Sequence, residues 1–162
     1  MRGGEHQGGP IILLTFIFAL MLSMIPFPSW AEEFRPHWVL LVLVYWSMAI
    51  PTRIGVGVAW VMGLLLDVTY DALLGQHALA LALVIFLTLN LHQRLRVFPI
   101  WQQAIVIFVF CVIYDMINLW IKGISGYAPN VWLYVLPSIT TALIWPVVYL
   151  VLRHARRFYR VA

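Results

Sequence analysis

The sequence predicts an all-α integral membrane protein, a bundle of six transmembrane helices with both termini in the cytoplasm, and three observations support this fold class. Of the 162 residues, 64% are apolar and only 10% are charged, and the mean hydropathy is +0.94. Soluble domains carry far more charge than this. The apolar residues form continuous runs of about 15 to 20 residues, close to the length that a helix needs to cross a bilayer. A β-barrel would instead show alternating segments of about ten residues.

Six apolar segments are expected to form the helices of this transmembrane domain, which covers residues 11–152. The first contains the uninterrupted run IILLTFIFALMLSMI, and the second and fourth are the shortest. The sixth contains Pro137 and Pro146, which we expect to kink it. The expected bounds are 1–10 for a cytoplasmic N-terminal segment, 11–30, 37–50, 54–71, 77–91, 99–121 and 131–152 for the helices, and 153–162 for a basic cytoplasmic tail.

The distribution of basic residues predicts the orientation of the bundle. Cytoplasmic loops carry the excess of Lys and Arg in membrane proteins, and here eight of the 10 basic residues fall on the side of the termini. The larger set is Arg2, Arg53, Arg94, Arg96, Arg153, Arg156, Arg157 and Arg160, and the smaller set is Arg35 and Lys122. Four of these residues, Arg153, Arg156, Arg157 and Arg160, form the tail and are expected to contact anionic lipid or a cytoplasmic partner.

The third predicted helix carries small residues in steps of four. Gly55, Ala59 and Gly63 lie along one ridge of this helix, and Asp67 continues the row. Small residues at this spacing let a second helix approach backbone to backbone in lipid. The ridge is therefore expected to pack against another helix, either from the chain's own bundle or from a partner chain.

Two acidic residues lie deep in predicted helices. Asp67 is thirteen residues past Ile54, about 20 Å along its helix. Asp115 is fifteen residues past Ile100, about 22 Å along a helix that runs in the same direction. A charge near the helix centre costs about 3 kcal/mol on insertion scales, so each acid needs protonation, a hydrogen bond or a cation. We expect a polar cluster of Asp67, Asp115 and Asn118, for which Arg35, His77 and Lys122 are the available cations.

Most catalytic and ligand-binding chemistries find little support. Paired acids occur in intramembrane aspartic peptidases, but the sequence around Asp67 is aliphatic and has no amide close by. Ser47 and Ser138 have no histidine at a depth where a base is needed. The five histidines lack metal-ligand spacing, and the basic residues form no continuous patch for nucleic acid. We expect no enzyme, metal, cofactor or nucleic acid; the alternatives are a small-molecule-binding transport subunit and an aspartic peptidase.

Four motifs in order along the chain resemble the family of rod shape-determining protein MreD. They are FRPHWVLLVLVYW (34–46), GLLLDVTYDALLGQHALALAL (63–83), WQQAIVIFV (101–109) followed by an intramembrane YD, and LIWPVVYLVLR (143–153). Each motif is mostly apolar and unspecific alone, and the resemblance depends on the four together. The positions that carry it include Arg35, Pro36, Trp38, Gly63, Asp67, Leu74, Gly75 and Asp115.

The resemblance implies a non-enzymatic, multi-pass protein of the bacterial inner membrane that belongs to the cell-elongation complex. It implies association with MreC, and through MreC with the MreB filament and with the transpeptidase and glycosyltransferase that make peptidoglycan. It also implies a helical architecture similar to the substrate-binding subunits of vitamin (ECF-type) transporters. We expect the ridge of Gly55, Ala59 and Gly63 to dock the membrane helix of MreC, and self-association of the chain stays open.

Overall fold

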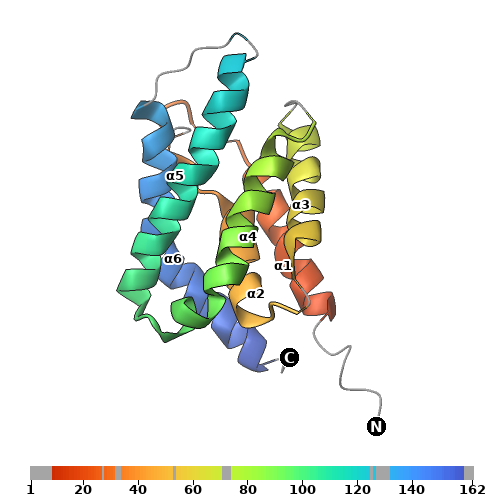
Figure 1. Cartoon of the computed structure of the whole chain (residues 1–162), viewed down its shortest axis with the longest axis vertical. Coiled ribbons are helices and arrows are strands. Elements are labelled where there is room, and N and C mark those ends of the chain that lie inside the picture. The colour runs from red at the N-terminus through yellow and green to blue at the C-terminus, as the bar shows by residue number, and fades with distance from the viewer. Residues whose placement is uncertain are drawn as a thin grey trace.

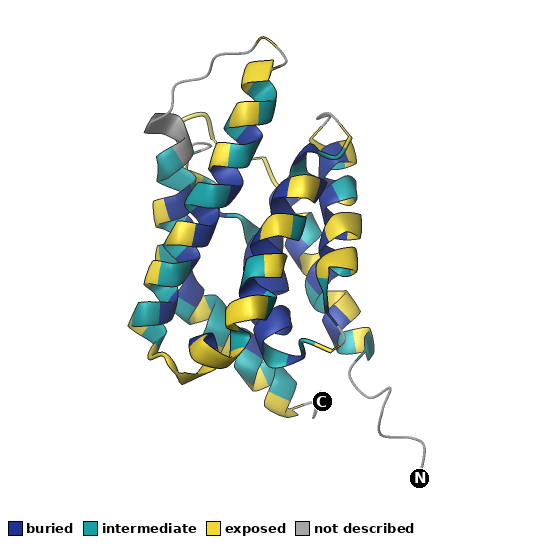
Figure 2. Ribbon diagram, viewed as in Figure 1, coloured by how far each residue is buried: buried dark blue, intermediate teal, exposed yellow. Residues whose placement is uncertain are grey.

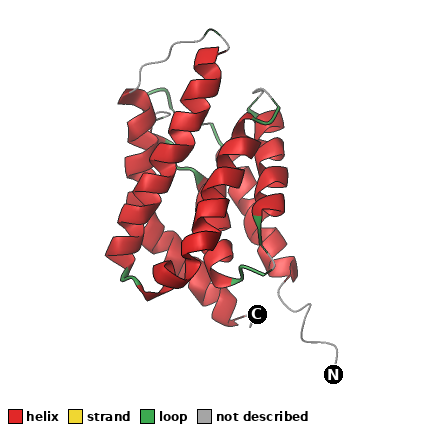
Figure 3. Ribbon diagram, viewed as in Figure 1, coloured by secondary structure: helices red, strands yellow, loops and turns green. Residues whose placement is uncertain are grey.

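The computed structural model describes residues 9–26, 28–31, 34–52, 54–70, 74–124, 126 and 132–158. All regular structure in these ranges is helical (Figures 1 and 3), which confirms the all-α fold class. The helices are α1 (Gly9–Met24), α2 (Trp38–Ala49), α3 (Val56–Thr69), α4 (Gln76–Val97), α5 (Ile100–Ile124) and α6 (Trp132–Phe158).

Three of the helices are long and apolar enough to cross a membrane: α4, α5 and α6. The others, α1, α2 and α3, have 16, 12 and 14 residues, and α2 is therefore only about 18 Å long. The hydrocarbon core of a bilayer is about 30 Å thick. Three helices thus support the interpretation that the chain is a membrane protein. The count of six membrane spans stays a prediction.

Three helix ends differ from the sequence-based bounds by six residues, and one of them is the end of α6, which continues past residue 152 to Phe158. The first helix ends at Met24 rather than at residue 30, because Pro26 and Pro28 follow and disfavour helix at the residues before them. The fourth helix continues past residue 91 to Val97, because polar side chains at the membrane surface do not interrupt backbone hydrogen bonds. Helix α6 runs through Pro137 and Pro146 as one helix, without the break that would suit a transporter cavity.

Helix α2 is the centre of the bundle. Ten of its 12 residues are buried, and it contacts α1, α4 and α6. Its indole Trp46 is fully buried and donates a hydrogen bond from Nε1 to Thr15 Oγ1 of α1 at 2.9 Å. A helix that is apolar on every face suits such a position, and its shortness is tolerated because its ends lie within protein rather than lipid.

The outward faces of the surrounding helices carry large apolar side chains. Figure 2 shows exposed residues along the outer sides of the helices and buried ones where the helices meet. Leu143, Val147 and Val109, for example, are 74%, 62% and 48% exposed. In water such a surface would be costly, whereas in lipid it is the normal exterior of a helical bundle.

Helices α3 and α4 are the most closely packed pair of helices in the described part of the chain. A Cβ atom added to Gly63 of α3 would lie 2.2 Å from Ala78 Cα and 2.4 Å from Ala78 N of α4, so only glycine allows this approach. Gly75, which precedes α4, has φ 99°, a left-handed conformation that also favours glycine. Two glycines therefore set the close crossing and the turn that position the site described next.

Candidate functional site

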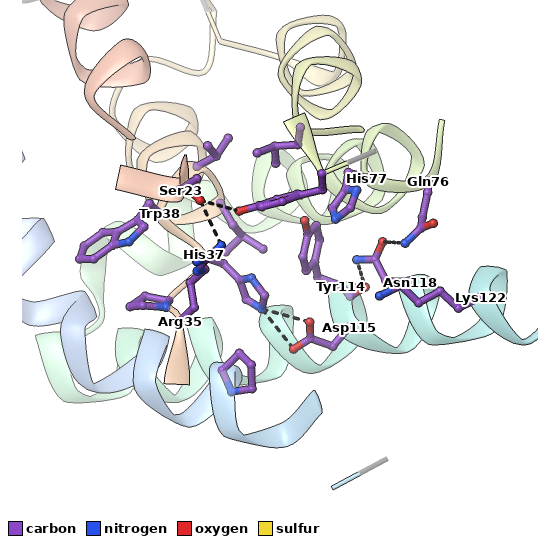
Figure 4. Close-up of a pocket in the computed structure, with 16 residues that line it drawn as sticks. Ser23, Arg35, His37, Trp38, Gln76, His77, Tyr114, Asp115, Asn118 and Lys122 are labelled. Atoms are coloured by element: carbon purple, nitrogen blue, oxygen red, sulfur yellow. Dashed lines mark hydrogen bonds and ion pairs between the residues drawn. The ribbon is translucent and has the colours of Figure 1, made fainter. Parts of the chain in front are cut away.

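A polar pocket of about 270 Å³ lies at the end of the bundle that is remote from the start of α1 and the end of α6 (Figure 4). Figure 1 shows this end of the bundle at the top. The C-terminal ends of α1, α3 and α5 surround it together with the N-terminal ends of α2, α4 and α6. Its polar lining consists of Ser23, Arg35, His37, Tyr70, Gln76, His77, Tyr114, Asp115, Asn118 and Lys122.

Asp67 is bound by three donors from the α3–α4 turn. Its carboxylate accepts hydrogen bonds from the backbone N–H of Gly75 and of His77, both at 2.8 Å, and lies 2.7 Å from His77 Nδ1. The side chain of Asp67 is fully buried behind His77. The left-handed Gly75 turns the chain so that these N–H groups point back at the last turn of α3. Asp67 therefore closes the turn between two helices.

Asp115 forms a second carboxylate–histidine pair. His37 Nε2 lies 3.0 Å from Asp115 Oδ1, and the hydroxyl of Ser138 donates to Asp115 Oδ2 at 2.8 Å. The backbone N–H of His37 donates to Thr141 Oγ1 at 3.1 Å. Asp115 thus joins α5 to the N-terminal end of α2 and to α6, three segments that are distant in the sequence.

The two pairs are connected through the ring of Tyr114. The centroid of this ring lies 4.8 Å from that of His37 and 6.0 Å from that of His77. Beside it, Gln76 Nε2 donates to Asn118 Oδ1 at 3.2 Å (Figure 4). Asp67, Asp115 and Asn118 are therefore in one polar region, but in the described part of the chain no hydrogen bond joins any two of them.

Sequence reasoning missed the role of His37 and named His77 only as one of three available cations. A signal for His77 was present, because it follows Asp67 by ten residues across a glycine turn. No local signal connects His37 to Asp115, since the two residues are 78 positions apart. The statement that Ser138 has no histidine at its depth is wrong, because both Ser138 and His37 bind Asp115.

This geometry does not match the hydrolytic sites that intramembrane acids suggest. An aspartic dyad needs two carboxylates that share a proton, whereas Asp67 and Asp115 each bind a different histidine. A serine triad needs serine, histidine and carboxylate in series, whereas Ser138 and His37 both contact the carboxylate. Among the described residues, no group of three His, Cys, Asp or Glu side chains is placed to hold a metal. The arrangement is suited to joining helices and to binding a small polar molecule.

Comparison with known proteins agrees with the motifs. The family model for rod shape-determining protein MreD matches residues 8–155. The rod shape-determining protein MreD of Haemophilus influenzae is 30% identical over 146 residues, which is 90% of each chain. The chain belongs to the MreD family. The resemblance is thereby confirmed, and membership in the MreD family supports a role in rod-shape determination.

No solved structure matches the chain. The architectural similarity of the chain to vitamin-transporter subunits therefore stays a prediction. It rests on the resemblance alone.

Besides Asp115, three of the positions named for the family resemblance line the pocket: Arg35, Pro36 and Trp38. The Arg35 guanidinium donates to the carbonyl oxygens of Ser23 at 3.2 Å and of Ile25 at 2.9 Å, at the C-terminal end of α1. A cation stabilises this end of a helix because the last carbonyls are unpaired and carry partial negative charge. Leu74 is exposed, and Gly75 forms the turn described above.

The small-residue ridge packs inside the bundle. Ala59 and Gly63 are buried, and Gly63 faces the backbone of Ala78 in α4. Gly55 precedes α3, and a Cβ atom added there would meet nothing within 4 Å. The expectation that this ridge docks MreC is therefore wrong at Gly63, because a helix of the same chain already occupies the close approach.

The predicted lipid contacts lie at the opposite end of the bundle. Arg153, Arg156 and Arg157 are in the last turns of α6 and line a second, larger pocket. Arg160 lies outside the described residues.

Proposed function

We propose that this chain is a non-catalytic scaffold of the bacterial inner membrane that crosses it with six helices and docks the membrane helix of MreC in the cell-elongation complex. Through MreC it acts on the MreB filament and on the transpeptidase and glycosyltransferase, and so helps to control peptidoglycan synthesis and cell shape. Family membership supports the role in shape. The two buried carboxylates support a structural rather than catalytic role, because histidines and N–H or O–H donors of the chain itself occupy them.

A single surface feature carries the docking proposal: an open apolar groove of about 620 Å³ between α1 and α6, with α2 as its floor. We call it the α1/α6 groove. Both α1 and α6 pack against α2. The space between α1 and α6 is open and forms the groove. Its lining residues are Ile11, Leu14, Thr15, Phe18, Ala19, Leu22, Trp38, Val42, Val147, Val148, Val151, Leu152 and Ala155.

The composition of the α1/α6 groove suits a helix as its occupant. Helices associate in lipid through close packing, which small residues in the contact favour. Ala19 and Ala155 provide such positions on the two walls, and Thr15 is the one hydroxyl among the lining residues. The groove replaces the ridge of the third helix as the surface that we assign to MreC.

Filling the α1/α6 groove should release MreC. We expect Val147→Trp to reduce the amount of full-length MreC that co-purifies from solubilised membranes at least fivefold, because the indole occupies the space of the docked helix. Val109→Trp is the matched control, since Val109 is also an exposed valine, 48% against 62%, but lies on α5 outside the groove. We expect this control to retain MreC within twofold. Equal recovery with both variants, or equal loss, would contradict docking in the groove.

The polar pocket favours a second function, a small-molecule-binding subunit. Its volume of about 270 Å³ and its mixed cationic, anionic and amide lining suit a small polar molecule. Native mass spectrometry of the purified chain should then show a bound species that Asn118→Leu removes, because leucine deletes the amide beside Gln76. A spectrum of the wild-type chain without an adduct, under conditions that preserve MreC binding, would rule against this function.

A further inference from the structure

A basic pocket of about 810 Å³ lies at the end of the bundle where α2 and α6 finish. The C-terminal end of α2 forms its roof through Tyr45, Met48 and Ala49, and α4 and α6 supply four arginines. The arginines are Arg96, Arg153, Arg156 and Arg157. This pocket is separate from the α1/α6 groove and from the polar pocket, with which it shares no lining residue.

The described residues at this end provide no carboxylate to balance the four charges. Of the six acidic residues in the chain, only Asp67 and Asp115 are described, and both bind histidines at the opposite end of the bundle. Four guanidinium groups around a concave surface add their potentials, and low-dielectric walls strengthen the result. The basic pocket therefore attracts an anion from outside the described part of the chain.

The protein holds part of this pocket in place. Arg96 donates from Nε to the carbonyl oxygen of Met48 at 2.6 Å and from Nη2 to that of Ala49 at 2.9 Å. Tyr45 and Tyr149 both line the pocket, and their rings pack edge-on with centroids 5.6 Å apart. Ordered guanidinium groups bind phosphate well, because their planar N–H donors match two phosphate oxygens at once.

The surroundings favour a lipid as the source of the phosphate. Leu143 and Leu150 precede Arg157 by two and one steps of seven residues, so the three share one face of α6. Both leucines are exposed, at 74% and 52%, and form an apolar stripe that leads to the pocket. Basic pockets between membrane helices on the cytoplasmic side are typical sites for anionic headgroups.

We infer that the basic pocket binds the phosphate headgroup of an anionic phospholipid, whose acyl chains lie along the exposed face of α6. Lipid binding in this pocket would be more specific than the general attraction of basic residues to an anionic membrane surface. It combines arginines from two helices, a helix end and two tyrosines in one concavity. The inference does not depend on MreC docking and goes beyond the proposed scaffold role.

The test compares two arginines at the same end of the bundle. The full chain is placed in nanodiscs of phosphatidylcholine that contain a small fraction of either phosphatidylglycerol or cardiolipin, and retained lipid is measured by native mass spectrometry. We expect Arg156→Gln to lower retention of anionic lipid at least tenfold. Arg94→Gln removes the same charge from an exposed position on α4 that does not line the pocket, and should change retention less than twofold. Arg153→Gln provides a second pocket variant if Arg156→Gln fails to fold.

Three outcomes would overturn the inference. Equal loss with Arg156→Gln and Arg94→Gln would show general surface attraction. Displacement of the lipid by glycerol phosphate or inorganic phosphate at equal phosphate concentration would identify a soluble phosphate as the ligand. Unchanged lipid retention in both pocket variants, with loss of a bound acidic partner protein instead, would assign the pocket to a protein.

Discussion

Replacing Gly63 with alanine should lower the free energy of unfolding by about 2–3 kcal/mol, and Gly63→Leu should prevent correct assembly of α3 on α4. The added Cβ would lie 2.2 Å from Ala78 Cα, and backbone atoms cannot rotate away as a side chain can. The two helices must therefore separate, which exposes Ala59 and other buried residues of α3. The measurement is detergent-induced unfolding of the purified chain, followed by tryptophan fluorescence.

Gly57→Ala is the matched control for this prediction. Gly57 lies on the same helix and is exposed, and a Cβ atom added there would meet nothing within 4 Å. We expect no loss of stability from this change, because alanine has a higher helix propensity than glycine. If Gly63→Ala and Gly57→Ala unfold at the same detergent fraction, the close crossing of α3 and α4 is not a determinant of stability.

Replacing Asp67 with asparagine should lower the free energy of unfolding by about 2–4 kcal/mol. Asparagine keeps the shape of the side chain but removes its charge and one acceptor. Its NH₂ group would take the place of one carboxylate oxygen and face the N–H of either Gly75 or His77, so at least one buried donor loses its partner. The change also leaves His77 without the carboxylate that now lies 2.7 Å from its ring nitrogen.

Thr69→Val is the control, because Thr69 lies two residues further on α3 and its hydroxyl donates to Leu65 O within the same helix. A double-mutant cycle separates the two carboxylate–histidine pairs. Asp67→Asn and His77→Ala should couple by about 1 kcal/mol or more, whereas Asp67→Asn and His37→Ala should be additive within about 0.5 kcal/mol, since His37 binds Asp115. Equal coupling in both cycles would contradict the separation of the pairs.

The sequence predicted the helical fold class well because this prediction depends on many apolar residues together and not on any single contact. An apolar run such as the one in α1 identifies a membrane helix by its length, whatever its neighbours are. The positions of the helices followed, with errors of six residues where prolines ended α1 and where polar or basic residues did not end α4 and α6. The polar cluster was anticipated only in part, because Asp67 and Asp115 were placed at one depth without their histidine partners.

The histidine partners depend on contacts that no local pattern contains. His37 lies at the start of α2, which the sequence predicted as the end of a membrane-spanning helix, yet α2 is short and buried, so its start lies inside the bundle. Because α2 is short, it also ends inside the bundle at its other end, and the basic pocket lies beside that end. The tertiary packing decides which helix is short and central. Hydropathy alone does not show which apolar helix lies at the centre.

The sequence by itself determined that this chain is an all-α protein with apolar helices, that its basic residues gather at the helix ends near the termini, and that it belongs among the MreD proteins. The tertiary structure decided how those helices are used. It turned the Gly63 ridge inward against α4, paired each acid with its own histidine, and left the α1/α6 groove open. The physical reason is that lipid and protein interior are equally apolar, so composition specifies a membrane helix but not which of its faces meets lipid, a neighbouring helix or a partner.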